Sequence, residues 1–293
     1  MKKIVITGAG GFLGTALMHR LVNKPDIMVY AFSFDFERHR STFVRGDNII
    51  PVDNSEIDTF DFSIADYVIH CAFPRNADSA VISDGLDFVA KVLKRAASSG
   101  AVINISSQSV YSPQRKCAAK ETDKPVLENK YAIGKYASEL LNNTLCAEIP
   151  HTNIRMASLI GPDFDQRVTN KMVELALKNG ELSVIEDNQT FGYLDIEDAA
   201  DGILSLLNIP SEKWRSVYNL GNGRTYSLKT IAETVASVIK SVLGKHIEIK
   251  SESGDKVLNS ALDGSTLMAD TGYKPCVSLE ESIHRILMKK IER

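Results

Sequence analysis

The sequence is poor in the residues that mark several classes of protein. Its four cysteines, Cys71, Cys117, Cys146 and Cys276, lie far apart and form no CxxC pair. The six histidines show no HExxH spacing or similar arrangement of metal ligands. These spacings predict neither a zinc site nor a disulfide framework. We therefore expect reduced thiols, no bound metal and a cytoplasmic location.

Charge of one sign and long hydrophobic runs are also lacking. The 34 Lys and Arg residues nearly balance the 37 Asp and Glu residues, for a formal net charge of −3. This balance argues against a nucleic-acid partner, for which a basic surface is expected. No stretch reaches 18 apolar residues, and the apolar run at the start is too short for a signal peptide. We expect a soluble globular protein with no membrane partner.

Short apolar runs alternate with segments of helical periodicity through the first half of the chain, which is typical of βαβ units. The predicted strands are residues 4–7, 28–32, 48–52, 67–72, 102–106 and 153–160. The predicted helices include residues 86–97 and 131–145, and later residues 168–178, 196–207, 228–243 and 279–291. This pattern predicts an α/β fold with a doubly wound parallel sheet of the Rossmann type. We expect a dinucleotide-binding domain at residues 1–162, to which later segments return, and a smaller, mostly helical substrate-binding part at residues 163–293.

A glycine-rich turn follows the first predicted strand. Gly8, Gly11 and Gly14 have GxxGxxG spacing, and an amphipathic helix begins at Phe12 and Leu13. Glycine permits a tight turn and a close approach of the backbone to a pyrophosphate, and the helix N-terminus offers free N–H groups. The position between a strand and a helix favours a dinucleotide site over an ordinary glycine-rich turn.

Tyr131 and Lys135 form a YxxxK pair, and residues four apart share one face of a helix. An ammonium about 4 Å from the phenol would contribute about 4 kcal/mol at an effective dielectric constant of 20, or roughly three pKa units. Lys135 would thereby lower the pKa of Tyr131 towards neutrality, where a general acid or base works best. The alternative is a surface tyrosine beside a solvated lysine. Ser107 ends a buried strand and would bring a hydroxyl to the same sheet edge.

Several segments together resemble the extended short-chain dehydrogenase/reductase superfamily, specifically its NAD-dependent epimerase/dehydratase family. These segments are TGAGGFLG at residues 7–14, SSQSVY at residues 106–111, YAIGK at residues 131–135 and NIRMASLIGP at residues 153–162. The resemblance implies Ser107, Tyr131 and Lys135 as the catalytic set. Tyr131 and Lys135 would also contact the cofactor, and Ser107, Gln108 and Ser158 would contact the substrate. It also suggests a homodimer through the helices at residues 86–97 and 131–145.

Further contacts with a nicotinamide dinucleotide follow from the same resemblance. The segment DYVIHCA at residues 66–72 resembles the DxVIHxAA strand, so Cys71 and Ala72 would flank the nicotinamide ribose. The pair Asp53 and Asn54 resembles the one that touches adenine. His70 is expected to be structural rather than catalytic.

The choice between NAD and NADP depends on the end of the second strand. An acidic residue there normally binds the ribose 2′-hydroxyl of NAD, but this strand ends at Ser33. Arg38 and Arg40 follow, and guanidinium groups suit a 2′-phosphate, which favours NADP. The alternative is that Asp35 binds the ribose of NAD.

The sequence departs from the family at positions that hold substrate. Phe191 and Glu252 replace two arginines that bind the substrate pyrophosphate in many nucleotide-sugar enzymes, and Ser158 replaces an asparagine. Arg75, Lys171 and Arg224 are other candidates for binding phosphate. Sugar 4,6-dehydratases have an Asp-Glu pair where this chain has Gln108 and Ser109, so dehydration is disfavoured.

Three hypotheses remain at this point. The favoured one is an NAD(P)-dependent epimerase or keto-reductase that acts on a sugar, activated by a nucleotide. The second is an NADP-dependent reductase of a small ketone or aldehyde that carries no nucleotide. The third is a non-catalytic protein that senses dinucleotides.

Overall fold

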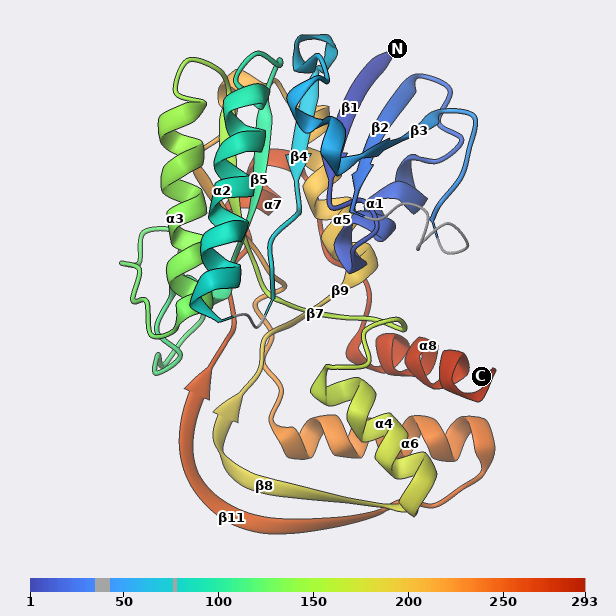
Figure 1. Ribbon diagram of the computed structural model, residues 1–293. Coiled ribbons are helices and arrows are strands. Elements are labelled where there is room, and N and C mark those ends of the chain that lie inside the picture. Colours follow the sequence, from blue (N-terminus) through green and yellow to red (C-terminus); the bar gives the residue numbers. More distant parts are fainter. Residues whose placement is uncertain (35–42, 76–77, 293) are drawn as a thin grey trace.

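The protein is described here by a computed structural model that covers residues 1–34, 43–75 and 78–292 (Figure 1). Seven parallel strands form the central sheet in the order β10-β6-β5-β4-β1-β2-β3. Their bounds are Lys2–Thr7 for β1, Ile27–Ser33 for β2, Ile49–Asp53 for β3, Tyr67–His70 for β4, Val102–Ser107 for β5, His151–Met156 for β6 and Val217–Leu220 for β10. The order reverses between β1 and β4, which confirms the predicted doubly wound fold. Ligands of such folds bind at this reversal, beyond the carboxyl ends of the strands.

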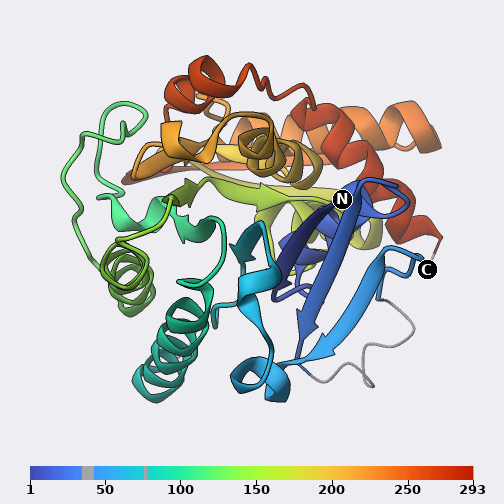
Figure 2. The same ribbon diagram turned by 90° about the horizontal axis from the view of Figure 1, so that it is seen from above.

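Helices cover both faces of this sheet (Figure 2). The helices α2 (Ser79–Ala96) and α3 (Lys130–Leu145) lie side by side on one face, and α1 (Phe12–Leu21) and α5 (Ile196–Ser205) pack together on the other. Alternate residues of β1 therefore face different cores. Ile4 and Ile6 belong to the core with α1, and Val5 belongs to the core with α2. Burial on both faces explains why these strands are continuously apolar.

A third hydrophobic core is built from α4 (Val168–Asn179), α6 (Leu228–Leu243) and α8 (Leu279–Ile291). It also includes residues of β8 (Glu181–Thr190), which pairs in parallel with β11 (Glu248–Asn259) to form a long two-stranded ribbon. Figure 1 shows these elements together below the central sheet. The predicted boundary near residue 162 stays a prediction, while β10 and α5 show that later segments do pack with the large sheet.

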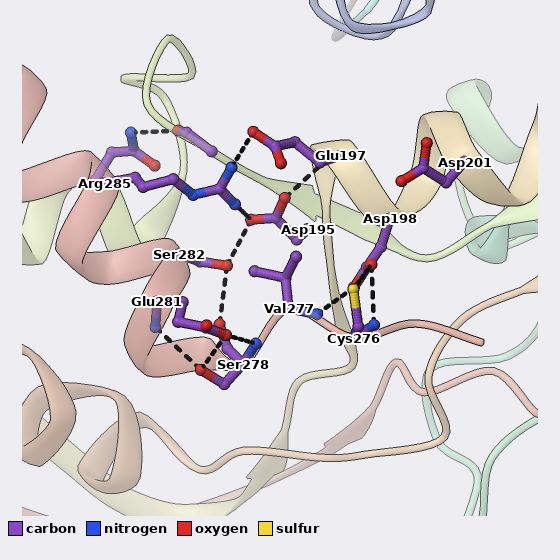
Figure 3. A network of polar contacts seen from close by, with 12 residues as sticks. Asp195, Glu197, Asp198, Asp201, Cys276, Val277, Ser278, Glu281, Ser282 and Arg285 are labelled. Carbon is purple, nitrogen blue, oxygen red and sulfur yellow. Dashed lines mark hydrogen bonds and ion pairs between the residues drawn. The ribbon is translucent and has the colours of Figure 1, made fainter. Parts of the chain in front are cut away.

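Two aspartates connect α8 and the segment before it to the start of α5 (Figure 3). The buried carboxylate of Asp195 accepts a hydrogen bond from the Ser282 hydroxyl and forms an ion pair with Arg285. Asp198 accepts the backbone N–H groups of Cys276 at 3.0 Å and Val277 at 2.9 Å. These contacts join the end of the chain to the sheet region through side chains.

The structure corrects several predicted elements. The strand predicted at residues 153–160 is two strands in different sheets, because β6 ends at Met156 and β7 (Ser158–Ile160) pairs with β9 (Tyr193–Asp195). Sequence patterns also did not predict β8, β9, β10, β11 and α7 (Ser265–Thr271). The later half of the chain is thus less purely helical than predicted. Of the helices that the structure describes, none has the length and apolar character needed to cross a membrane.

Candidate active site

A cavity of about 820 Å³ opens at the carboxyl ends of β1, β4 and β5, next to the start of α3 and the segment before α4. Most of the residues predicted from the sequence line it together. They are Gly8, Gly11, Phe12, Leu13, Gly14, Cys71, Ala72, Ser107, Gln108, Tyr131, Lys135 and Ser158. Five separate stretches of the chain therefore meet in one place, as the predicted site requires.

The glycine-rich turn has the backbone geometry that a pyrophosphate needs. Gly8 has a φ of +75°, a conformation that disfavours side chains with a Cβ atom. A Cβ atom on Gly14 would lie 2.1 Å from the carbonyl oxygen of Gly8. No side chain of the described chain caps the start of α1 at Gly11, so the first N–H groups of the helix stay available. The turn therefore fits the phosphates of a dinucleotide.

The residues predicted to contact the adenosine half lie outside the lining of this cavity. Ser33 is buried at the end of β2, and its hydroxyl donates to the carbonyl of Phe34 at 3.4 Å. Asp53 accepts the N–H of Ser55 at 2.8 Å and caps the short 3-10 helix Asn54–Asp58. The Asn54 Oδ1 atom is buried without a hydrogen-bond partner in the described part of the chain. Arg38, Asp35 and Arg40 lie outside the described residues.

Ser107 and Tyr131 come from neighbouring elements. Ser107 is the last residue of β5. Its hydroxyl oxygen accepts hydrogen bonds from the Ser109 N–H at 3.2 Å and from the Ser109 hydroxyl at 3.0 Å. Asn129 caps the start of α3 by accepting the Ala132 N–H at 2.8 Å, which places Tyr131 in the first turn. Ser107 and Tyr131 both line the cavity, and the Ser107 side chain lowers the pKa of Tyr131.

The predicted electrostatic role of Lys135 is wrong for this structure. Burial raises the pKa of Tyr131, and the charges of Arg75 and Arg167 and the nearby Ser107 side chain oppose the rise. The Lys135 ammonium instead donates to the carbonyl of Ile105 at 2.7 Å and lies 4.4 Å from the centre of the Phe73 ring. Because Lys135 is buried, its own pKa falls to about 8. The YxxxK spacing predicted that Tyr131 and Lys135 share a helix face. It could not predict the conformation of the long Lys135 side chain, which directs the ammonium to another partner.

A buried polar network connects the elements that carry Ser107 and Tyr131. The sequence patterns did not predict it. Arg155 on β6 forms an ion pair with Glu139 on α3 at 2.8 Å and donates to the Tyr111 hydroxyl at 2.9 Å. The Tyr111 hydroxyl in turn donates to the Asn219 side chain on β10 at 2.9 Å. Ser106, next to Ser107, donates to Glu139. An arginine inside a predicted buried strand was the signal that could have revealed the network, since buried charges need partners.

Two arginines and two phenylalanines form the side of the cavity near α4. Phe164 stacks on Phe12 with ring centres 4.4 Å apart. The guanidinium carbons of Arg75 and Arg167 lie 4.1 Å and 4.8 Å from the centre of the Phe164 ring. Lys171 also lines the cavity, while Arg224 does not. Arg75 and Lys171 were candidates from the sequence, whereas Arg167 and Phe164 belong to no recognised motif and were missed.

His70 has a structural environment. Its Nδ1 atom lies 2.6 Å from the Thr7 hydroxyl oxygen, and burial lowers its pKa to about 3. The ring is therefore neutral at physiological pH. Within the described ranges, no group of three or more His, Cys, Asp or Glu side chains is arranged to hold a metal ion.

Comparison with known proteins identifies the family. The sequence profile of the NAD dependent epimerase/dehydratase family matches residues 4–221, about three quarters of the chain. The chain belongs to this family. Its relatives include UDP-glucuronic acid decarboxylase 1 of Arabidopsis thaliana, 24% identical over 97% of this chain and 69% of the relative. Another is dTDP-4-dehydro-6-deoxyglucose reductase of Escherichia coli, 21% identical over 97% of this chain and 96% of the relative.

Solved structures of other proteins have the same fold. UDP-glucuronic acid 4-epimerase of Bacillus cereus, crystallised with NAD, superposes with a TM-score of 0.81 at 20% identity, covering 99% of this chain and 100% of the other. Membership of the NAD dependent epimerase/dehydratase family makes this protein an enzyme, so we set aside the hypothesis of a non-catalytic sensor.

Proposed function

We propose that the protein is an NAD(P)-dependent epimerase or keto-reductase that acts on a nucleotide-activated sugar. One observation carries this proposal. The glycine turn that fits a dinucleotide and the set Ser107, Tyr131 and Lys135 line one cavity of about 820 Å³, which is large enough for a nicotinamide ring and a sugar together. The relatives named above act on UDP-linked or dTDP-linked sugars, which supports the same substrate class here.

The proposed mechanism assigns one task to each residue. A bound nicotinamide dinucleotide supplies the acceptor and donor of hydride. Tyr131 gives its proton to the ketone oxygen on reduction and, as the phenolate, takes the proton from the sugar hydroxyl on oxidation. Ser107 holds the same oxygen through a hydrogen bond. Lys135, whose pKa of about 8 lets it carry charge at neutral pH, holds the ribose next to the nicotinamide.

The protonation state of Tyr131 fits a proton donor in the unliganded enzyme. Burial raises its pKa, so the phenol keeps its proton at neutral pH. The two arginines and Ser107 favour the phenolate and reduce the cost of removing that proton. Gln108 and Ser109 line the cavity where a dehydratase of the family would have acidic groups, which supports epimerisation or reduction over dehydration.

Replacing Tyr131 with Phe tests the proposed mechanism directly. The substitution removes the proton carrier and leaves the ring, so we expect turnover to fall by about 10² to 10⁴. Cofactor affinity should change little, as measured by fluorescence titration with NADH. Tyr136→Phe on the same helix is the matched control, because Tyr136 does not line the cavity. Unchanged turnover of Tyr131→Phe with the cofactor bound would contradict the assignment.

NADP remains our proposed cofactor, with NAD as the alternative. The support is that β2 ends at Ser33, without a carboxylate that would repel a 2′-phosphate. We expect NADPH to bind more tightly than NADH in parallel fluorescence titrations. Because phosphate recognition is electrostatic, the difference should shrink as salt rises. Tighter binding of NADH at low salt would contradict this proposal.

A small ketone or aldehyde is the second candidate substrate. The replacement of family arginines by Phe191 and Glu252 favours it. Thermal-shift measurements with UDP, GDP, CDP and dTDP separate the two candidates, since a ligand at 100 times its Kd adds about 2.7 kcal/mol to stability. A shift with any of the four supports a nucleotide-sugar, and none would favour the small substrate. Homodimerisation and a cytoplasmic location belong to the proposal as well.

A further inference from the structure

Arg115 is half-buried beside the candidate active site and forms no ion pair within the described ranges. It lies in the loop between β5 and α3, and it does not line the cavity. Its guanidinium group donates to the backbone carbonyls of Ser112 at 2.6 Å and Ala261 at 3.0 Å, and to the side-chain Oε1 atom of Gln108 at 3.3 Å. One of the three neutral oxygens that hold this charge therefore belongs to a residue of the site.

The contact with Arg115 determines which end of the Gln108 amide is free. A guanidinium group has five N–H donors and no acceptor, so only the oxygen of the amide can face it. The Nε2 atom of Gln108 has no hydrogen-bond partner in the described part of the chain, and it is not fully buried. Because Gln108 lines the cavity, this nitrogen is left as a donor for a ligand there.

Ser107 offers a donor in the same way. Its hydroxyl oxygen accepts hydrogen bonds from both the N–H and the hydroxyl of Ser109. These two bonds occupy the two lone pairs of the oxygen, so the Ser107 proton is what remains for a ligand. Gln108 is the next residue, and consecutive Cα atoms are about 3.8 Å apart. Two neighbouring residues of the site thus have their acceptor atoms bound within the protein and a donor left over.

We propose that Gln108 donates a hydrogen bond from Nε2 to a sugar oxygen at or next to the reacting carbon, and that Arg115 is the positioning residue that fixes this orientation. The inference rests on the proposed function, which places the reacting oxygen at Ser107. Arg115 acts through Gln108, since it lies outside the cavity lining. The site then selects a substrate oxygen that can accept a hydrogen bond, on either a hydroxyl or a carbonyl group.

Side-chain amide signals in NMR spectra test the orientation without a substrate. Labelling with ¹⁵N-glutamine gives one such signal for each of the four glutamines, Gln108, Gln114, Gln166 and Gln189. The signal that is lost in Gln108→Met is assigned to Gln108. We expect Arg115→Met to move this signal by more than its line width, because the amide oxygen loses a bond to a cation. Lys116→Met removes an exposed cation from the same loop and should leave the signal in place.

Calorimetric titrations test the contact with the sugar. UDP-glucose, dTDP-glucose, UDP and dTDP are titrated into the cofactor-loaded enzyme, in the Tyr131→Phe background to prevent turnover. We expect Gln108→Met to weaken the binding of a sugar nucleotide about three- to tenfold, as one hydrogen bond implies, and to change the affinity for UDP or dTDP less than about twofold. Gln108→Glu should weaken it at least as much, because its carboxylate would pair with Arg115 and present an acceptor to the sugar.

A double-mutant cycle tests whether Arg115 acts through Gln108. Arg115→Met should weaken sugar-nucleotide binding nearly as much as Gln108→Met, and the double variant should lose no more than the larger single loss. Arg115→Lys keeps a donor for the Gln108 oxygen and should retain part of the affinity. Gln114→Met, which alters an exposed residue outside the lining, should leave every affinity unchanged. Thermal melts verify that each variant is folded.

The outcomes separate this inference from the function on which it rests. An unmoved Gln108 signal in Arg115→Met, or single losses that add in the double variant, would overturn the role of Arg115. Equal losses for the sugar nucleotides and for UDP or dTDP would overturn the contact with the sugar. A moved signal in an enzyme that binds its cofactor but none of the four nucleotides would overturn the nucleotide-sugar proposal and leave the orientation of Gln108 standing.

Discussion

At the scale of single residues, Lys135 makes the stability of the protein depend on pH. Burial lowers its pKa from 10.5 to about 8, so between these values the unfolded chain binds the proton more tightly than the folded protein. Stability from this group therefore rises as pH increases through 8. From pH 7.5 to 9.5 the expected gain is about 2 kcal/mol. Lys135→Met, which keeps the side-chain volume, should lack this gain.

Urea unfolding at the two pH values measures the effect as a difference between the two proteins. Cysteines and tyrosines that titrate in the same range are present in both, so their contributions largely cancel. Cys71 is one of them, because burial raises its pKa to about 12 and its effect runs in the opposite direction. Equal changes with pH in the wild type and Lys135→Met would show that Lys135 is not the buried cation described here.

At the scale of elements, one buried carboxylate determines how firmly α8 is attached. The Asp195 side chain is 1% exposed, and its partners Ser282 and Arg285 both lie on α8. We expect Asp195→Asn to lower the free energy of unfolding by about 3 kcal/mol, near the low end for a broken buried pair because Arg285 retains Glu197. The control is Asp201→Asn, whose exposed pair with Arg20 should contribute less than about 1 kcal/mol.

Chemical denaturation checks both variants, and fluorescence titration checks their cofactor affinity. None of Asp195, Asp201, Ser282 and Arg285 lines the candidate site, so neither variant should change that affinity by more than about twofold. A cost for Asp195→Asn no greater than that for Asp201→Asn would mean that α8 is held by its apolar face alone.

Elements whose hydrophobic pattern matched their environment were predictable from the sequence, and elements without such a pattern were not. The strands β1 and β5 are buried on both faces and read as continuous apolar runs. The strand β11 is mostly exposed and carries polar residues on both sides, so no alternation marks it. Ala157 joins β6 to β7 without a turn residue, which hid the change from the sheet of β6 to that of β7.

The residues of the candidate site also fall into those that the sequence predicted and those that it did not. Gly8, Tyr131 and Ser107 belong to motifs with fixed spacing, and the structure brings them together. Arg167 and Phe164 follow β7 in a segment without a recognisable pattern, so only their packing in three dimensions shows that they face Arg75. The hydrogen bond of Lys135 to a backbone carbonyl depends on a side-chain conformation, which spacing along a helix does not determine.

At the scale of the whole molecule, the exposed face of α2 and α3 predicts a homodimer. Ile133 and Leu140 are both 50% exposed and lie two helical turns apart on one face of α3, and Val81 on the neighbouring α2 is 44% exposed. A two-fold contact would bury this apolar surface against its copy in a four-helix arrangement, and each large side chain contributes about 1.5–3 kcal/mol when fully buried. The cavity lining at Tyr131 belongs to the same helix, so the contact would also stabilise the site.

Light scattering after size-exclusion chromatography tests this prediction. We expect a wild-type mass near twice the 32.2 kDa of one chain, and a monomer for Leu140→Glu, which would place a buried unpaired charge against its copy. Leu175→Glu on α4 is the matched control, because Leu175 is 47% exposed on an element outside the predicted contact and its variant should remain a dimer. A monomeric wild type, or a dimer that Leu175→Glu dissociates and Leu140→Glu does not, would move the interface away from α2 and α3.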